Sequence, residues 1–403
     1  MHCTRKITDS LIYVGADTRR TMLFEGVYDV KAGMAYNSYL LKDSKTALFD
    51  TVDRSVSELF FRNLEYALEG RALDFVVVQH MEPDHSATLF EIIKRYPDVT
   101  VVCNKKTEPM IKQFYGAPER VMLVSDGDVL DLGEHKIKFV FAPMVHWPEV
   151  MVSFDLTDGT LFSADAFGNF GATSGAIFAD EVNYERDYLD EARRYYTNIV
   201  GKYGPQVEAL LSKAATLPIR RICPLHGHIF RRDFGFIIEK YALWASYTPE
   251  TYGALILYAS IYGNTENAAV ATAFALRERR VETKVHDVSV SDHSAIIADA
   301  FKYSHIILAS PTYNSGIFVK MHELLLELAA HAVKGRSYAI IDNGTWAATA
   351  GKQMAEIVGG IKDSRILDAR ISFKSSFGEE NEALLAEFAD KLAEDIKSVK
   401  NDK

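Results

Sequence analysis

The chain has 403 residues, of which 48% are hydrophobic and 25% charged, and its formal net charge is −10. This length exceeds one ordinary domain and predicts two, each with its own core. An acidic chain without a basic stripe is a poor partner for nucleic acid, and no apolar run is long enough to cross a bilayer. The N-terminal segment lacks the apolar region of a signal peptide. We therefore expect a cytoplasmic protein.

The three cysteines, Cys3, Cys103 and Cys223, are far apart and odd in number. This pattern excludes a disulfide framework, and no CxxC pair is present to hold zinc or a rubredoxin-type iron. The thiols are expected to be reduced, as in the cytoplasm.

In the first half of the chain, short apolar runs alternate with turns. The patterns predict three hairpins, at 37–51, 129–143 and 151–165. They also predict buried strands at 74–80 and 99–104, and a strand running into a loop at 220–228. Helices are predicted at 85–97 and within 183–215. The first half is therefore expected to form a sandwich of mixed sheets with helices outside.

The pattern changes near residue 248, at the polar connector YTPETYG. Strands and helices then alternate strictly, with strands predicted at 254–260, 281–288, 305–310, 337–343 and 365–373, and helices at 265–279 and 319–333. Such alternation favours a doubly wound parallel sheet. We predict two domains, 1–248 and 249–403.

The stretch QHMEPDHSATLF, residues 79–90, places two histidines and two acids within six positions directly after a buried strand. These residues are His80, Glu82, Asp84 and His85. Imidazole nitrogens and carboxylate oxygens suit borderline transition metals. The alternative is a solvated loop that carries two histidines by chance.

Three further candidate ligands, His146, Asp165 and His226, follow other predicted strands. Each alone would be an ordinary core or loop residue. Together with the first cluster they predict a pair of metals. We assign His80, Glu82 and His146 to one metal and Asp84, His85 and His226 to the other. Asp165 would bridge the two.

This ligand pattern resembles the metallo-β-lactamase fold, whose zinc hydrolases carry a second histidine where this chain has Glu82. With the carboxylate there, the HxExDH form and the later ligands at this spacing are similar to those of the flavodiiron proteins. A carboxylate is a harder ligand than an imidazole, which favours iron over zinc at this site. The resemblance covers essentially the whole chain. It implies an α/β protein in which a metallo-β-lactamase-like αββα sandwich precedes a flavodoxin-like doubly wound sheet.

The second half offers its own cofactor site. LILYASIYGNTENAA is a strand, a loop and a helix, and backbone N–H groups in such a loop can hold a phosphate. Neither GxGxxG nor GxxxxGK[ST] is present, so a dinucleotide fingerprint or a P-loop is not supported. The resemblance implies FMN, and the third loop departs from the Gly-Ser-Tyr-Gly-Trp pattern that is common in the family. The predicted contacts are Ser260, Ile261, Tyr262, Gly263, Asn264 and Thr265; Pro311, Thr312, Tyr313, Asn314 and Gly316; and Asn343, Gly344, Thr345 and Trp346.

The resemblance also implies an activity: reduction of O2 to water, or of NO to N2O, at two non-haem irons. FMN would pass electrons from an external donor. Because the chain ends without a CxxC pair, we expect a separate rubredoxin, with F420H2 as an alternative donor. A head-to-tail homodimer, or a dimer of dimers, would bring FMN close to iron.

Two alternatives remain: a zinc hydrolase fused to a flavodoxin-like domain, and a plain FMN electron carrier. Phe167, Phe170 and Tyr195 are candidates for groups around the metals, although they can equally be core aromatics. His228 is expected to lie outside the ligand set.

Overall fold

The computed structural model describes residues 1–401. The chain divides into two compact units, Met1–Ala242 and Leu243–Lys403. The sequence placed the boundary slightly later, after residue 248, because the polar connector was the visible signal there. Strand β17 (Thr251–Tyr258) in fact begins inside that connector.

The first unit contains two main sheets. One has the order β1-β2-β7-β8-β9-β10-β11 and the other the order β12-β13-β14-β15-β16. The strands of the first are β1 (Arg5–Lys6), β2 (Leu11–Tyr13), β7 (Tyr39–Lys42), β8 (Thr46–Phe49), β9 (Phe75–Val77), β10 (Thr100–Asn104) and β11 (Val121–Val124). Those of the second are β12 (Val129–Asp131), β13 (Lys136–Phe141), β14 (Met151–Asp155), β15 (Thr160–Phe162) and β16 (Arg221–Cys223). The three predicted hairpins are confirmed as the antiparallel pairs β7/β8, β12/β13 and β14/β15.

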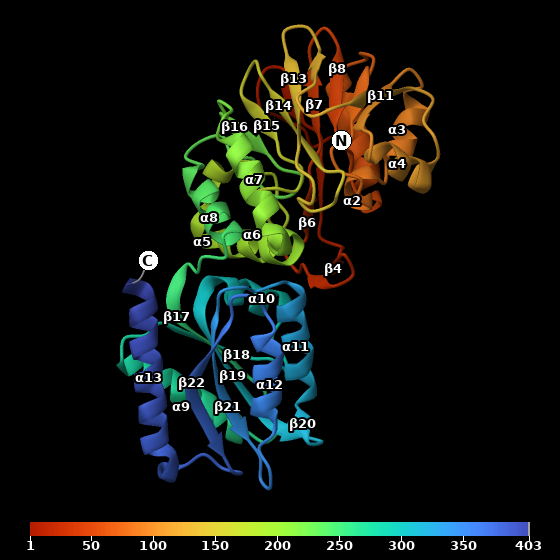
Figure 1. Cartoon of the computed structure of the whole chain (residues 1–403). Coiled ribbons are helices and arrows are strands. Elements are labelled where there is room, and N and C mark those ends of the chain that lie inside the picture. Colours follow the sequence, from red (N-terminus) through yellow and green to blue (C-terminus); the bar gives the residue numbers. More distant parts are fainter. Residues whose placement is uncertain (402–403) are drawn as a thin grey trace. The chain divides into compact units, whose positions relative to one another are not determined.

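Two short strand pairs complete this unit: β3 (Ala16–Thr18) with β6 (Met34–Tyr36), and β4 (Leu23–Phe24) with β5 (Tyr28–Asp29). Its α-helices are α1 (Ser57–Leu68), α2 (Pro83–Ser86), α3 (Leu89–Arg95), α4 (Thr107–Tyr115), α5 (Tyr184–Asp187), α6 (Leu189–Tyr195), α7 (Gly204–Ala214) and α8 (Gly235–Ala245). Figure 1 shows α2, α3 and α4 beside the first sheet and α5 to α8 beside the second.

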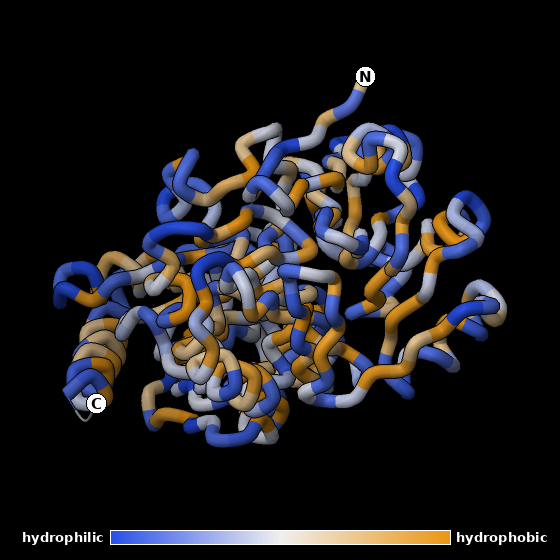
Figure 2. The backbone as a smooth tube through the Cα atoms, turned by 90° about the horizontal axis from the view of Figure 1, so that it is seen from above, coloured by the Kyte–Doolittle hydropathy of each residue, from blue (hydrophilic) through white to orange (hydrophobic). Residues whose placement is uncertain are grey.

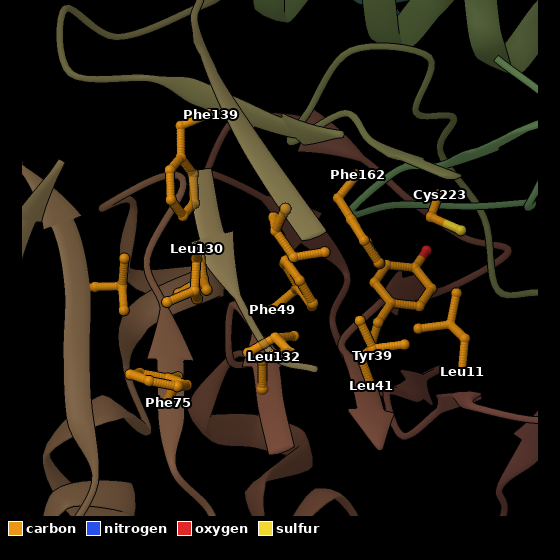
Figure 3. Packing of buried hydrophobic residues seen from close by; sticks show 14 of the residues in the cluster. Leu11, Tyr39, Leu41, Phe49, Phe75, Leu130, Leu132, Phe139, Phe162 and Cys223 are labelled. Carbon is orange, nitrogen blue, oxygen red and sulfur yellow. The ribbon is translucent and has the colours of Figure 1, made fainter. Parts of the chain in front are cut away.

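The core of the first unit lies between the two sheets. Alternate residues of each strand point into it, such as Tyr39 and Leu41 of β7 opposite Phe162 of β15 (Figure 3). The rings of Phe49 and Phe162 stack with centroids 3.8 Å apart, and so join the two layers directly.

One predicted helix is divided in two. The sequence indicated a single helix over 85–97, but α2 ends at Ser86 and α3 begins at Leu89. The carbonyl of His85 accepts hydrogen bonds from the backbone N–H and the hydroxyl of Thr51, each at 2.8 Å. Because that carbonyl is used outside the helix, the helical ladder stops and restarts.

The second unit is a parallel sheet of order β18-β17-β19-β21-β22, with β20 paired to β19. The strands are β17, β18 (Thr283–Asp287), β19 (Tyr303–Tyr313), β20 (Gly316–Ile317), β21 (Ser337–Asn343) and β22 (Arg365–Phe373). The helices are α9 (Asn264–Glu278), α10 (His293–Lys302), α11 (Val319–Ala330), α12 (Ala350–Gly359) and α13 (Glu382–Asn401). Figure 1 shows α9 and α13 on one face of the sheet and α10, α11 and α12 on the other. The doubly wound sheet predicted from the sequence is thus confirmed.

Helix α13 illustrates how each helix is attached to its sheet. Phe388, Leu392 and Ile396 recur every four residues and are all buried. Along the helix that ends at C in Figure 2, orange and blue alternate accordingly. Among residues 1–401, no helix is both long enough and apolar enough to cross a membrane.

Candidate metal centre and flavin pocket

The loop after β9 and the short helix α2 that follows it carry four of the predicted ligands, and buried hydrogen bonds fix the path of this segment. The carboxylate of Asp50, at the end of β8, accepts hydrogen bonds from the backbone N–H and side-chain amide of Gln79, each at 2.8 Å. The backbone N–H of His80 lies 3.3 Å from the same carboxylate. Asp50 is 1% exposed, so water does not compete for these bonds.

The other three predicted ligands also follow strands of the first unit. His146 lies between β13 and β14, Asp165 follows β15, and His226 follows β16. Because β15 and β16 are parallel neighbours, their carboxyl ends deliver Asp165 and His226 to the same edge of the second sheet. The fold thereby brings together residues that are far apart in the sequence.

Four of the seven residues form one group, called position A here: His80, Glu82, His146 and Asp165. The Nε2 atom of His146 lies 3.0 Å from Glu82 Oε2 and 3.1 Å from Asp165 Oδ2. The Nε2 atom of His80 lies 3.3 Å from each of the same two oxygens. Four potential ligand atoms thus converge on one point.

The remaining three form position B: Asp84, His85 and His226. Asp84 Oδ2 lies 3.2 Å from Nε2 of His85 and 3.1 Å from Nε2 of His226. Asp165 contributes here as well, because its Oδ1 atom lies 3.0 Å from His85 Nε2 and 3.7 Å from His226 Nε2. One oxygen of Asp165 therefore faces each position, which is the arrangement of a bridging carboxylate.

These spacings fit metal coordination. Ligands at bonds of about 2.1 Å lie about 3.0 Å apart along an octahedron edge and about 3.4 Å apart along a tetrahedron edge. Within residues 1–401, both oxygens of Asp84 and of Asp165, and Nε2 of His85 and of His226, are buried without a hydrogen-bond partner. Buried polar atoms normally have partners. Two metal ions would supply them.

The same crowding shifts the pKa values of the ligand groups. Burial opposes protonation of His85, but the charges of Asp84 and Asp165 raise its pKa to about 9. Against its burial, the pKa of His146 is likewise raised to about 9 by the adjacent carboxylates of Asp165 and Glu82. The pKa of the Asp165 carboxyl is held well below 3.8, against its burial, by His85, His80 and His146. Without a metal, the carboxylates therefore stay ionised and the histidines hold protons, which a binding metal ion would displace.

Two buried acids beside this centre were missed by the sequence analysis. Glu149 lies 2.9 Å from Nδ1 of His80, the ring nitrogen that faces away from position A. Asp50 holds the ligand loop, as described above. In the sequence, Glu149 stands out only as an acid three residues after His146 and just before a strand. Its role depends on a contact across 69 residues, which no local pattern reveals.

Of the aromatic residues predicted around the metals, Tyr195 packs beside a candidate ligand, whereas Phe167 does not. The ring of Tyr195 lies 5.5 Å from that of His226 and 5.2 Å from that of Phe170, and its hydroxyl has no partner within residues 1–401. Burial, together with the charge of Asp165, raises the Tyr195 pKa well above 10. Phe167 instead packs on Tyr241.

His228 lies outside both ligand groups, as the sequence suggested. Tyr188 and Tyr184 pack edge-on against its ring. Burial lowers its pKa to about 4, so it is neutral.

In the second unit, the three predicted loops enclose a cavity of about 520 Å³. They follow β17, β19 and β21 on either side of the point where the strand order reverses, which is where doubly wound sheets bind ligands. Gly263 adopts a left-handed φ of 88°, and its N–H donates to the Ser260 hydroxyl at 3.0 Å. This turn leads directly into α9.

Most predicted flavin contacts line this cavity. Gly263 and Gly316 lie outside its lining, and Ser315, Ala347 and Ser375 join it. Ser375 was not visible as a candidate because it follows β22, a strand whose loop carried no motif. The structure places it there through the hydrogen bond from Asn343 Nδ2 to its carbonyl, at 3.1 Å.

Comparison with known proteins agrees with this geometry. Residues 34–227 match the family described as "ODP family beta lactamase", and residues 256–396 match "Flavodoxin". An anaerobic nitric oxide reductase flavorubredoxin of Vibrio vulnificus is 32% identical over 350 residues, which cover 85% of this chain and 70% of that protein. The chain belongs to the flavodiiron protein family. A nitric oxide reductase of Moorella thermoacetica is also 32% identical, over 87% of this chain and 88% of its own.

Solved flavodiiron structures share the fold over nearly the whole chain. The rubredoxin oxygen:oxidoreductase of Desulfovibrio gigas matches with a TM-score of 0.92 at 27% identity, covering 98% of this chain and 99% of its own. The flavodiiron protein of Giardia intestinalis matches with a TM-score of 0.91 at 25% identity, covering 98% of each chain. This flavodiiron protein is therefore an oxidoreductase. Its flavodoxin domain implies FMN, and its two ligand groups fit a diiron site.

Proposed function

We propose that this flavodiiron protein reduces NO to N2O, and O2 to water, at two irons held by the seven residues of positions A and B. The observation that carries the proposal is the placement of the two Asp165 oxygens, one toward each position. A shared carboxylate keeps two metals adjacent, so that one small molecule, or two, can meet both. The irons supply electrons and open coordination sites.

The choice of gas rests on the relatives. The relatives of Vibrio vulnificus and Moorella thermoacetica are named as nitric oxide reductases, whereas a structural neighbour is named for oxygen. NO reduction is therefore the first candidate and O2 reduction the second. Two NO molecules with two electrons and two protons give N2O and water. One O2 takes four electrons and four protons to give two waters.

Electrons reach the metal centre through FMN in the cavity of the second unit. The loop 260–265 would hold its phosphate, because backbone N–H groups and the start of α9 favour an anion there. The external donor is rubredoxin, as the name of the Desulfovibrio gigas protein suggests, with F420H2 as the alternative. The protein acts in the cytoplasm.

The two redox sites lie on different units, so we propose a head-to-tail homodimer in which FMN of one chain serves the irons of its partner. Exposed apolar side chains support this. Tyr262 and Trp346 at the flavin pocket are 90% and 88% exposed. Met22, just before β4, and Val27, on the β4–β5 turn, are 63% and 69% exposed. If a dilute, monodisperse monomer keeps full turnover, the dimer proposal fails.

Anaerobic stopped-flow mixing of the reduced, iron-loaded protein with each gas tests the function. We expect reoxidation of FMN by both gases, with N2O formed from NO in a ratio of one to two. A zinc hydrolase would instead contain zinc and leave the flavin reduced. A plain flavin carrier would give the same rates with and without iron, so iron removal separates it from a gas reductase.

A further inference from the structure

Positions A and B offer the same kinds of ligand but different outer partners. Each presents two histidine Nε2 atoms, one carboxylate of its own and one oxygen of Asp165. By these groups alone, the two positions should bind metal equally. The difference lies at the Nδ1 atoms on the far sides of the histidine rings.

At position A, the far side of His80 meets a carboxylate. Its Nδ1–H donates to Glu149 Oε1 at 2.9 Å, and the backbone N–H of Met81 donates to the same oxygen at 3.0 Å. The side chain of Glu149 is 0% exposed, and its second oxygen has no partner within residues 1–401. A buried carboxylate with one bare oxygen is costly unless positive charge lies close by.

At position B, the corresponding partners are neutral or missing. Nδ1 of His226 donates to the backbone carbonyl of Ala35 at 2.8 Å. Nδ1 of His85 is buried with no hydrogen-bond partner within the described part of the chain. Position A therefore has a carboxylate hydrogen-bonded to one of its histidine rings, whereas at position B the buried Asp50 carboxylate interacts with His85 through charge alone.

A carboxylate that accepts the Nδ1 proton raises the basicity of the ligating imidazole and fixes its ring. The added charge also favours the more highly charged state of a metal across the ring. We propose that Glu149 is a positioning residue that makes position A bind metal more tightly than position B, and makes the metal at A the first to be oxidised. When an oxidant such as ferricyanide removes one electron from the reduced iron pair, the resulting ferric ion is then the one at position A.

This inference rests on the ligand set proposed above, and the test separates the two. Metal-free protein is titrated with Co²⁺, and crystals grown with one equivalent are examined by anomalous diffraction. We expect the first cobalt at position A. Equal filling of both positions overturns the inference and leaves the ligand set intact. No cobalt at either position overturns the ligand set itself.

Glu149→Gln keeps the shape and a hydrogen-bond acceptor but removes the charge. We expect Co²⁺ binding at position A to weaken about 10- to 100-fold, the usual cost of losing such an outer partner, with position B changed by less than about twofold. Glu108→Gln is the matched control, because Glu108 lies on α4 and pairs with Lys112. Equal weakening at both positions would indicate a general loss of structure and overturn the specific role.

Iron-loaded protein provides an independent readout in the reduction potentials, followed by electron paramagnetic resonance of the half-oxidised pair. In Glu149→Gln, the gap between the two iron potentials should shrink, because the potential at A rises. Glu149→Asp, which keeps the charge, should retain more of the gap. An unchanged gap in Glu149→Gln refutes the proposal. Should that variant fail to fold, the order of cobalt filling in the natural protein decides.

Discussion

The metal centre and the flavin pocket are built in opposite ways. Six of the seven candidate metal ligands are buried, and Glu82 is partly exposed. His80 and His226 are 0% exposed and Asp165 is 1% exposed. The flavin pocket has a buried inner wall, including Thr265 and Asn343, but a rim that faces solvent. A metal ion is a small target that needs several side-chain atoms within a few ångströms of one point. A flavin is a large flat surface that three loops can border with backbone and side chain alike.

This contrast explains where rigidity is located. Around the metals, Asp50, Thr51 and Glu149 hold the ligand loop by buried hydrogen bonds to its backbone and to His80. Around the flavin, fewer bonds link the loops, such as those from the N–H groups of Thr349 and Ala350 to the Thr312 hydroxyl. Substitutions should therefore have sharp effects in the metal centre and graded effects at the flavin rim.

The largest effect is expected from Asp165→Asn. The amide keeps the size of the side chain but cannot bridge two metals through two anionic oxygens, so both positions lose a ligand at once. Gas reduction should fall at least about 100-fold, and metal content should fall with it. Iron analysis and anaerobic gas-consumption assays measure these losses, and the flavin spectrum should stay unchanged.

Asp131→Asn is the control for that substitution, since Asp131 is a surface residue paired with Lys136. It should leave iron, flavin and turnover as they are. If Asp165→Asn kept two irons per chain and full turnover, the bridging role would be wrong, and with it the contrast between the sites.

The convergence of the seven residues of positions A and B could be predicted because metal chemistry restricts residue type. Histidines and acids are rarely crowded, so the stretch 79–85 stood out, and His146, Asp165 and His226 each followed a recognisable strand. Glu149 and Asp50 could not be found in this way. They act through contacts with residues distant in the sequence, and a single acid at a strand end is ordinary.

The positions of the flavin loops could be predicted from the sequence, but the individual residues that line the cavity could be predicted less completely. Strand alternation predicted three loops at strand ends, and these loops border one cavity where the order of the doubly wound sheet reverses. Ser375 follows β22 and contains no motif, so only the fold brings it to the pocket. The split between α2 and α3 likewise depends on Thr51, which lies far upstream of the helical pattern.

An effect on stability is expected in the second unit from Asp299→Asn. Burial alone would raise the Asp299 pKa, but hydrogen bonds from His286 and Lys284, each at 2.7 Å, lower it below 3.8. The stabilisation is therefore fully present above pH 3.8 and is lost as the pH falls through the folded-state pKa. At neutral pH the substitution should cost about 1–3 kcal/mol.

Flavin fluorescence during urea unfolding at several pH values measures this. The natural protein should lose stability in acid more steeply than the variant, whose neutral amide does not titrate. Equal acid sensitivity would show that Asp299 is not responsible. If iron is lost at the same urea concentration as the flavin, the two units unfold together, and the separation between them is weaker than their architecture suggests.

The choice of metal is tested by Glu82→His, which restores the histidine of the zinc hydrolases. An imidazole is a softer ligand than a carboxylate, and the change removes one negative charge from position A. In cells supplied with both metals, the iron-to-zinc ratio should fall about tenfold, as measured by elemental analysis. Glu134→Gln, an exposed charge elsewhere on the first unit, should not alter the ratio. An unchanged ratio would mean that selection for iron lies outside this ligand.

The smallest effect is expected at the flavin rim. Trp346 is 88% exposed and borders the pocket, so its indole can stack on one side of the flavin only. Such a contact contributes about 0.5–1.5 kcal/mol, and Trp346→Ala should therefore weaken FMN binding by roughly 2- to 12-fold. Trp346→Phe keeps a ring and should retain most of the affinity, as followed by quenching of FMN fluorescence. A loss of 100-fold or more would instead place Trp346 among the residues that fix the cofactor. The rim would then be as sharply specified as the metal centre, and the contrast between a fixed ion site and an adaptable flavin site would no longer hold.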